Sequence, residues 1–222
     1  PAKCVVGEMI PISATAWREG HDALGVTLHV ETPYRTSFDV RMSASSEPDI
    51  YNAAIVPDAV GYWTFRIEAW SDLYATWRSA VEKKIDAGQG AEDLANDLEI
   101  GARVLTEAAE SVDGDDRQLL LDAVDSLRSR RRRIENRVGM ALSDEVAELL
   151  DAHPVRELVT KSRNLRIWTD RRRALYGSWY EMFPRSTGGW DNDGRPVHGT
   201  FLTAAADLSR IADMGFDVVY LP

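Results

Sequence analysis

The chain has 222 residues and a formal net charge of −10, with 36 acidic residues against 26 Lys and Arg. This balance argues against binding nucleic acid or an anionic membrane through bulk electrostatics. The single cysteine, Cys4, excludes an intrachain disulfide and a zinc site built from several cysteines, and we expect it to be an inert buried thiol. No apolar run approaches eighteen residues and no secretory signal opens the chain, so we expect a cytoplasmic protein without a membrane span.

Residues 1–70 predict a β-rich region. Apolar residues alternate with polar or small ones over 10–16, 24–30 and 62–69, and this period of two marks strands with one buried face. Glycines and prolines punctuate the segments, and no helical run interrupts them. Short, evenly spaced strands of this kind favour an antiparallel sandwich. The stretch 59–65, AVGYWTF, resembles the corner that enters a late strand of an immunoglobulin-like sandwich.

Residues 72–153 predict helices. Apolar residues recur at three- and four-residue spacing in four stripes, which favours a small bundle of antiparallel helices. Gly88 follows the first stripe as a left-handed cap, Ser143 caps the fourth, and Pro154 ends it. The stripes are Tyr74, Trp77, Val81 and Ile85; Leu94, Leu98, Leu105 and Ala109; Leu120, Val124 and Leu127; and Val146, Leu149 and Leu150.

The segment 155–177 is mixed. Residues 155–159 predict a turn of helix. Leu165, Ile167 and Thr169 predict a strand, which we expect to return to the sandwich. The helices would then be an insertion within the β-rich region.

The last stretch, 178–222, predicts one strand–helix–strand unit. Residues 178–186 predict a buried strand, 201–214 a helix with one apolar face and Gly215 as its stop, and 216–222 a second buried strand. Such units build parallel sheets. One unit cannot bury both faces of its sheet, so we expect the start of a larger α/β domain.

Several motifs carry a family resemblance. Residues 179–186 (WYEMFPRS) and 214–222 (MGFDVVYLP) look like the first and second strands of the catalytic barrel in the α-amylase clan of glycoside hydrolases. Motifs upstream are more specific and resemble the N-terminal part of the bacterial alpha-1,4-glucan:maltose-1-phosphate maltosyltransferases. These motifs are WREGHDA at 17–23, AWSD at 69–72, ATWR at 75–78 and ELVT at 157–160.

The resemblance implies a multi-domain fold. It implies an immunoglobulin-like β-sandwich at 1–71 and 155–176, an inserted helical bundle at 72–154, and the first β-α-β unit of a truncated TIM (β/α)8 barrel at 177–222. It also implies that the sandwich and the insert form much of a homodimer interface.

The implied reaction transfers maltose from maltose 1-phosphate to the non-reducing end of an α-1,4-glucan, with retention, in glycogen or α-glucan synthesis. It implies no cofactor. Retention requires two carboxyl groups about 5 Å apart. In the clan these lie on later barrel strands, beyond Pro222. The resemblance therefore implies that this chain holds no catalytic residue and is inactive alone.

Four residues near the end of the first barrel strand are candidate substrate contacts. Barrel active sites form at the C-terminal ends of strands, which places Tyr180, Glu181, Arg185 and Ser186 near the pocket. The alternative is that Tyr180 and Glu181 pack inside the barrel and Arg185 pairs with a carboxylate. His198, in a loop near this strand, either faces the same site or lies on the surface.

Two charged clusters have structural explanations. Residues 191–194 (DNDG) offer oxygen ligands for calcium, but their spacing does not fit an EF-hand loop, so we expect an Asx-Gly turn and no metal. The Arg128–Arg137 run offers anion binding, but the acidic chain and the lack of interleaved aromatics favour a solvated helix end paired with carboxylates. The run also departs from the family pattern, so the resemblance assigns it no role.

The seven tryptophans suggest sugar stacking as an alternative to core packing. Trp63 and Trp168 fall on strand faces that we expect to be buried, whereas Trp17, Trp77 and Trp190 are undetermined. An alternative function is therefore an α-glucan-binding sandwich in another enzyme of the α-amylase clan, a hydrolase or a branching enzyme.

Overall fold

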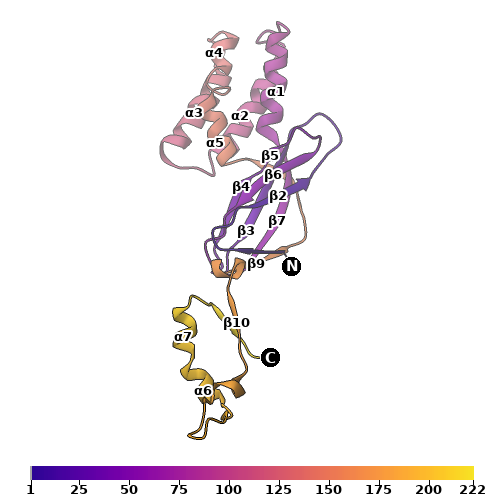
Figure 1. Ribbon diagram of the computed structural model, residues 1–222. Coiled ribbons are helices and arrows are strands. Elements are labelled where there is room, and N and C mark those ends of the chain that lie inside the picture. The colour runs from indigo at the N-terminus through magenta and orange to yellow at the C-terminus, as the bar shows by residue number, and fades with distance from the viewer. Residues whose placement is uncertain (1) are drawn as a thin grey trace.

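The computed structural model describes residues 2–222, which form three parts arranged end to end (Figure 1). Two β-sheets occupy the middle, the helices of residues 73–152 lie at one end, and a strand–helix–strand unit lies at the other. Within the described residues, no helix is both long and apolar enough to cross a lipid bilayer.

The larger sheet has six strands, in the order β1-β9-β7-β3-β4, with β8 also paired to β7. The predicted strand at 165–169 is β9, and it lies between β1 and β7. The pairing of β1 with β9 is parallel, so the expectation of a wholly antiparallel region is wrong. The strands are β1 (Ala2–Val5), β3 (Leu24–Glu31), β4 (Ser37–Arg41), β7 (Gly61–Asp72), β8 (Arg156–Lys161) and β9 (Leu165–Asp170).

The smaller sheet has three strands and packs face to face on the larger one. Its order is β2-β6-β5, all antiparallel, and the strands are β2 (Ile10–Thr15), β5 (Ser43–Ala44) and β6 (Ile50–Ile55). Alternate residues of both sheets meet in one hydrophobic core, as their period of two requires. This core includes Ile12 and Ile55 from the smaller sheet, and Val26, Leu28, Val30, Trp63 and Ile167 from the larger one.

The strand β3 is buried on both faces, and the prediction of one buried face is therefore wrong for it. Gly25 and Thr27 are covered because the indole of Trp70, directly opposite Gly25 on β7, lies across them. A Cβ atom at Gly25 would overlap this ring. The Trp70 Nε1–H donates to Thr27 Oγ1 at 3.1 Å, which satisfies the indole donor in a buried position.

Arginine side chains join this indole to the helices. The guanidinium of Arg41 lies 4.4 Å from the Trp70 ring centroid, and that of Arg156 lies 5.4 Å from it. Arg41 also binds Asp72 at 2.8 Å and Asp151 at 3.4 Å. Asp72 ends β7 and caps the first helix, with its Oδ1 accepting from Ala75 N–H at 2.9 Å. One side chain therefore holds both the start and the end of the helical segment against the sheet.

The predicted helical stripes form the core of the helical segment. All buried members, among them Trp77, Leu98, Leu105, Leu120 and Val146, belong to a single cluster. Ser143 Oγ accepts from Val146 N–H and Gly88 has φ +79°, as predicted. The helices are α1 (Leu73–Asp86), α2 (Ala95–Ala108), α3 (Gly114–Arg128), α4 (Ile134–Val138) and α5 (Asp144–Ala152). The short α4 has no counterpart in the prediction.

Residues 155–159 do not form the predicted turn of helix. Most of them belong to β8, which pairs antiparallel with β7 and has a register shift between Ala69 and Ser71. Leu158 has φ +52° and its side chain is exposed. This irregular backbone explains why a strand with no alternation of buried and exposed residues was missed.

The C-terminal unit contains two parallel strands, as predicted, but in a shorter form. These are β10 (Trp179–Glu181) and β11 (Val218–Tyr220). The predicted long first strand gives way to a 3₁₀ helix at Pro184–Thr187. The predicted single helix is divided at Asp207 into α6 (Phe201–Ala206) and α7 (Leu208–Asp213).

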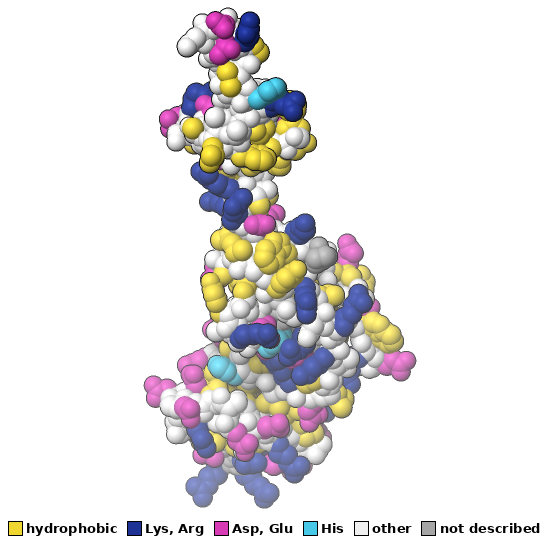
Figure 2. All heavy atoms as spheres, turned by 90° about the horizontal axis from the view of Figure 1, so that it is seen from below, with side chains coloured by type: hydrophobic (Ala, Val, Ile, Leu, Met, Phe, Trp, Pro, Cys, Tyr) yellow, Lys and Arg dark blue, Asp and Glu magenta, His cyan; other side chains and the backbone are white. Residues whose placement is uncertain are grey.

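Most apolar side chains of this unit lie on its surface (Figure 2). Its small core holds Met182, Ala204 and Ile211, whereas Phe201 is 74% exposed and Trp179, Phe183 and Leu208 are also exposed. The prediction of buried strands is therefore wrong for this chain. The physical reason is that no element within the described residues packs over these side chains.

We predict that Gly101→Ala lowers the free energy of unfolding by about 1–3 kcal/mol. A Cβ atom at Gly101 of α2 would overlap the buried indole of Trp77. This overlap outweighs the gain in helix propensity of up to about 1 kcal/mol. Urea unfolding monitored by circular dichroism measures the change. Gly90→Ala is the matched control, because the nearest atom to a Cβ at Gly90 would be 3.9 Å away. If Gly101→Ala were as stable as this control, the close packing of Gly101 on Trp77 would be contradicted.

We also predict an acid-dependent loss of stability through Asp39. Burial of this carboxyl raises its pKa, but hydrogen bonds from His29 and Arg156 outweigh burial and hold the pKa below its ordinary value of 3.8. The stabilisation of the folded state by ionised Asp39 is thus present above about pH 4, and it is lost as the pH falls through the lowered pKa. Because Asp39 is partly exposed, we expect about 1 kcal/mol or less.

The measurement compares the free energy of unfolding at pH 7 and pH 3 for wild type and Asp39→Asn. The variant should lose less stability on acidification. Asp58→Asn, at an exposed position without an ion pair in the described residues, is the control and should behave as wild type. Equal acid sensitivity of all three proteins would contradict the prediction.

Candidate functional site

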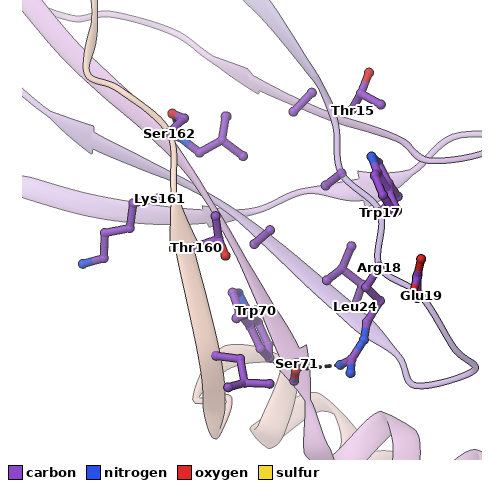
Figure 3. Close-up of a pocket in the computed structure, with 15 residues that line it drawn as sticks. Thr15, Trp17, Arg18, Glu19, Leu24, Trp70, Ser71, Thr160, Lys161 and Ser162 are labelled. Carbon is purple, nitrogen blue, oxygen red and sulfur yellow. Dashed lines mark hydrogen bonds between the residues drawn. The ribbon is translucent and has the colours of Figure 1, made fainter.

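A pocket of about 650 Å³, which we call the sandwich pocket, lies at one edge of the two packed sheets (Figure 3). The segment that follows β2 forms one wall, β8 forms the opposite wall, and β7 lies between them. The smaller sheet ends here with β2, so the inner face of β7 is only half covered at Ile67 and Ala69. Three motifs distant in sequence, 17–23, 69–72 and 157–160, all contribute to this pocket.

The first wall is fixed by hydrogen bonds from Arg18. Its Nη1 donates to Ser71 Oγ at 2.6 Å, as drawn in Figure 3, and its Nη2 pairs with Asp22 at 3.0 Å. Ala23 N–H donates to Thr76 Oγ1 at 2.8 Å, which ties the same segment to α1. Next to this anchored arginine the indole of Trp17 is 68% exposed, so the pocket rim carries a free aromatic face.

The opposite wall is polar. Thr160, Lys161 and Ser162 line it, together with the exposed Leu158. The Lys161 ammonium lies 3.4 Å from Glu68, and Ser162 Oγ accepts from Ile67 N–H. Burial of Glu68 raises its pKa, but the bonds and charges of Arg66 and Lys161 outweigh burial, so the pKa lies below the ordinary value and Glu68 stays ionised at neutral pH.

This arrangement is suited to binding a ligand. Glu19 is the one carboxylate among the residues that line the pocket, whereas retaining glycosyl transfer requires two. Within residues 2–222 no group of three His, Cys, Asp or Glu side chains is arranged to hold a metal ion. An exposed indole above an apolar floor, with hydroxyl groups opposite, matches the surfaces that take a sugar ring.

The four predicted substrate contacts lie in the C-terminal unit, around two other pockets. Tyr180, Glu181 and Ser186 line one of about 650 Å³, together with Arg210. The Tyr180 ring packs edge-to-face on Phe216 at 5.1 Å, so it is partly structural. The hydrogen bond from Arg210 lowers the pKa of Asp207, and this pair closes one side of the pocket.

Arg185 and Ser186 line the second pocket, of about 430 Å³, with Trp190 and His198. Arg185 forms no ion pair with any carboxylate of the described residues, so the expected pairing is absent from residues 2–222. Trp190 is 73% exposed and forms an isolated bridge with Pro196. His198 is exposed and lies beside Arg185, not in the sandwich pocket.

The structural explanation is confirmed for residues 191–194 and only in part for the arginine run, where within the described residues Arg128 alone pairs with a carboxylate. Asp191 Oδ1 accepts from the N–H groups of Asp193 and Arg195, and Gly194 has φ +74°, which confirms the Asx-Gly turn. In the Arg128–Arg137 run, Arg128 pairs with Glu99 at 3.0 Å. Arg132 binds Ser126 and Arg137 binds the carbonyl oxygen of Leu127, while the remaining arginines are exposed.

The tryptophan predictions were right for Trp63 and wrong for Trp168. Trp63 is 3% exposed and donates to Ala59 O at 3.0 Å. Trp168 is half-buried, because it pairs with the exposed Tyr62 on the outer face of the sheet at 4.9 Å. Cys4 is buried beside Thr169, as predicted, with Sγ 3.3 Å from its hydroxyl.

Sequence reasoning missed the sandwich pocket itself. It singled out Trp17 and the three motifs, but it did not bring Arg18 and Ser71 together across 53 positions. The available signal was that three family-specific motifs, far apart in the sequence, could share one site; two of them, 69–72 and 157–160, lie on the paired strands β7 and β8.

Comparison with known proteins assigns this arrangement to a family. Residues 1–171 match the family model described as alpha-1,4-glucan:maltose-1-phosphate maltosyltransferase, domain N/S. The chain belongs to the alpha-1,4-glucan:maltose-1-phosphate maltosyltransferase family. The matched region includes both sheets, the helical segment and the sandwich pocket.

Curated maltosyltransferases match over the whole chain. The protein from Corynebacterium glutamicum is 51% identical, that from Mycolicibacterium smegmatis 49% and enzyme 1 from Streptomyces coelicolor 44%. The match covers 100% of this chain and 34%, 36% and 32% of those proteins, so the chain spans about a third of their length. A solved structure, a putative glycoside hydrolase from Bacteroides vulgatus, is 14% identical in sequence. The match covers 34% of this chain and 14% of the hydrolase chain, and its TM-score of 0.25 is too low to support a structural argument.

Proposed function

We propose that this chain is the N-terminal, dimer-forming part of a maltosyltransferase. The enzyme would transfer maltose from maltose 1-phosphate to the non-reducing end of an α-1,4-glucan, with retention at the anomeric carbon, in glycogen or α-glucan synthesis. The observation that carries the proposal is the match of residues 1–171 to the domain N/S model of this family. Identity near 50% over the full chain supports it.

The proposed domain organisation assigns a role to each part. Residues 1–71 and 155–176 would form an immunoglobulin-like sandwich, 72–154 a bundle inserted in it, and 177–222 the first β-α-β unit of a TIM barrel. The parallel pairing of β10 with β11, joined through α6 and α7, supports the last assignment. The exposed apolar residues of that unit would be covered by further barrel elements, and the sandwich and bundle would supply the homodimer interface.

The proposed chemistry lies outside this chain. Retention requires a nucleophilic carboxylate and an acid/base carboxyl group about 5 Å apart. The sandwich pocket has one carboxylate, and we assign no catalytic role to any residue of 2–222. Tyr180, Glu181, Arg185 and Ser186 are proposed as substrate contacts. Tyr180 and Glu181 lie at the C-terminal end of β10, and Arg185 and Ser186 lie in the 3₁₀ helix that follows it.

A phosphate-release assay tests this function. The complete protein encoded by the gene, given maltose 1-phosphate and glycogen, should release phosphate and lengthen the glucan. The chain of residues 1–222 alone should release none, since we place the two carboxyl groups elsewhere. Release by this chain alone would contradict that placement, and hydrolysis of the glucan without phosphate release would point to another activity of the clan.

A second candidate function is α-glucan binding by the sandwich. The specific observation is the pocket rim, where the exposed indole of Trp17 stands beside the anchored Arg18 and opposite Thr160. The flat face of a glucose ring would pack on the indole, and its hydroxyl groups would meet the polar wall.

Affinity electrophoresis tests the second candidate. Glycogen in a native gel should retard the 222-residue chain, and Trp17→Ala should abolish the retardation. Because Trp17 is exposed, the substitution should change the free energy of unfolding by no more than about 0.5 kcal/mol. Trp179→Ala, which removes a similarly exposed indole of the C-terminal unit, outside the pockets to which we assign a ligand, is the control. Equal mobility of wild type with and without glycogen would eliminate this function.

A further inference from the structure

A further cavity lies where the helical segment meets the larger sheet (Figure 1), and we call it the junction cavity. Its volume is about 630 Å³, within the range of roughly 300–1,000 Å³ that holds small molecules. Strands β3, β4 and β8 line one side with Thr27, Arg41 and Arg156, and residues of α1 and α5 line the other. A molecule bound here would touch the sheet and both ends of the helical segment at once.

One nitrogen atom in this cavity has no partner. Nη1 of Arg41 is a buried atom that makes no hydrogen bond within the described residues. The other two nitrogens of the same guanidinium are engaged, Nη2 with Asp72 at 2.8 Å and Nε with Asp151 at 3.4 Å. A buried donor without an acceptor is unfavourable, so this position favours an oxygen atom from a bound molecule.

The carboxylates nearest to the sheet are already occupied. Both oxygens of Asp39 accept hydrogen bonds, one from His29 at 2.7 Å and the other from Arg156 at 3.0 Å. Both oxygens of Asp72 are also taken, one by Arg41 and the other by a backbone N–H of α1. The free donor of Arg41 is therefore left to a ligand.

The charges around the cavity favour an uncharged ligand. Three arginines and four carboxylates line it, so the positive and negative charges nearly balance. An anion would face the four carboxylates, whereas a hydroxyl group can accept from a guanidinium and donate to the exposed Asp151. Ala147, Leu150 and Pro154 add apolar surface that suits the C–H face of a ring.

We propose that the junction cavity binds a small neutral saccharide, of one or two rings, that bridges the sheet and the helical segment. One hydroxyl oxygen would accept from Nη1 of Arg41. Another would accept from Arg78, whose Nε bonds to Glu82 at 2.9 Å while its Nη2 lies 3.9 Å from Asp144, beyond hydrogen-bond distance. The junction cavity shares no lining residue with the sandwich pocket or the C-terminal unit, so the inference does not rest on the proposed function.

Hydrogen–deuterium exchange of the complete protein tests the site, because it reads this cavity separately from any other saccharide site. Maltose and glucose are the probes. With a Kd of about 1 mM, a saccharide at about 10 mM should slow exchange roughly tenfold in peptides 72–80 and 146–154, which contain the residues of α1 and α5 that line the cavity.

Two variants locate the binding. Arg78→Gln should raise the saccharide concentration needed for protection roughly tenfold or more, the usual effect of losing a hydrogen bond to a charged group. Arg103→Gln is its matched control, because Arg103 also pairs with a glutamate one helical turn away but lies outside the cavity. Ala152→Phe, at an exposed position that lines the cavity at the end of α5, should block binding. Ala95→Phe, at an exposed helix end outside the cavity, should behave as wild type.

Thermal melts should show that every variant is folded, and Arg41 is left unchanged because it holds the helices to the sheet. Unchanged exchange in both peptides of the wild type with either saccharide would overturn the inference, because water alone would then meet Arg41. Wild-type protection in both Arg78→Gln and Ala152→Phe would overturn it as well. Protection by inorganic phosphate and by neither saccharide would show an anion site instead, and protection confined to peptides 14–24 and 158–162 would place the saccharide in the sandwich pocket. A failed phosphate-release assay alters none of these readouts, so the proposed function and this inference are tested separately.

Discussion

The packing of Trp70 across Gly25 is the contact on which the arrangement of the sheets and helices depends. The indole fits because Gly25 has no side chain, and its nitrogen is satisfied by Thr27. Its ring then offers a surface to Arg41, which reaches Asp72 at the start of the helices and Asp151 near their end. Pairs of this kind are individually weak in water, but here they converge on a buried ring, so the helical segment is held in one orientation.

Sequence patterns predicted those elements whose burial follows a simple period. The strands β2 and β7 and the four long helices have apolar faces defined by neighbours that are themselves predictable, such as the cluster around Leu105 and Val146. The strand β8 escaped prediction because Leu158 points to solvent and the register shifts beside it. The site was only partly predictable: exposed residues such as Trp17 were noticed, whereas the Arg18–Ser71 contact depends on pairing between distant segments.

The family match and the geometry agree on which part of the chain holds the sandwich pocket. The match extends to residue 171, and the sandwich pocket, which is lined by residues from 14 to 162, lies wholly inside it. The C-terminal unit follows beyond that boundary as a separate hydrophobic cluster, around Met182 and Ile211. The pocket proposed to bind glucan and the proposed substrate contacts around Tyr180 and Arg185 thus lie in two parts of the chain that do not share a core.

The parallel pairing of β1 with β9 has a consequence for the order of folding. Cys4 and Thr169 touch across a separation of 165 residues, which is the kind of contact that slows folding when the intervening chain is disordered. The helices between them fold from local contacts, and Arg41 draws their two ends together. During synthesis β1 cannot pair with β9 until β9 has left the ribosome. The helical segment is therefore expected to fold before β1 joins the edge of the larger sheet.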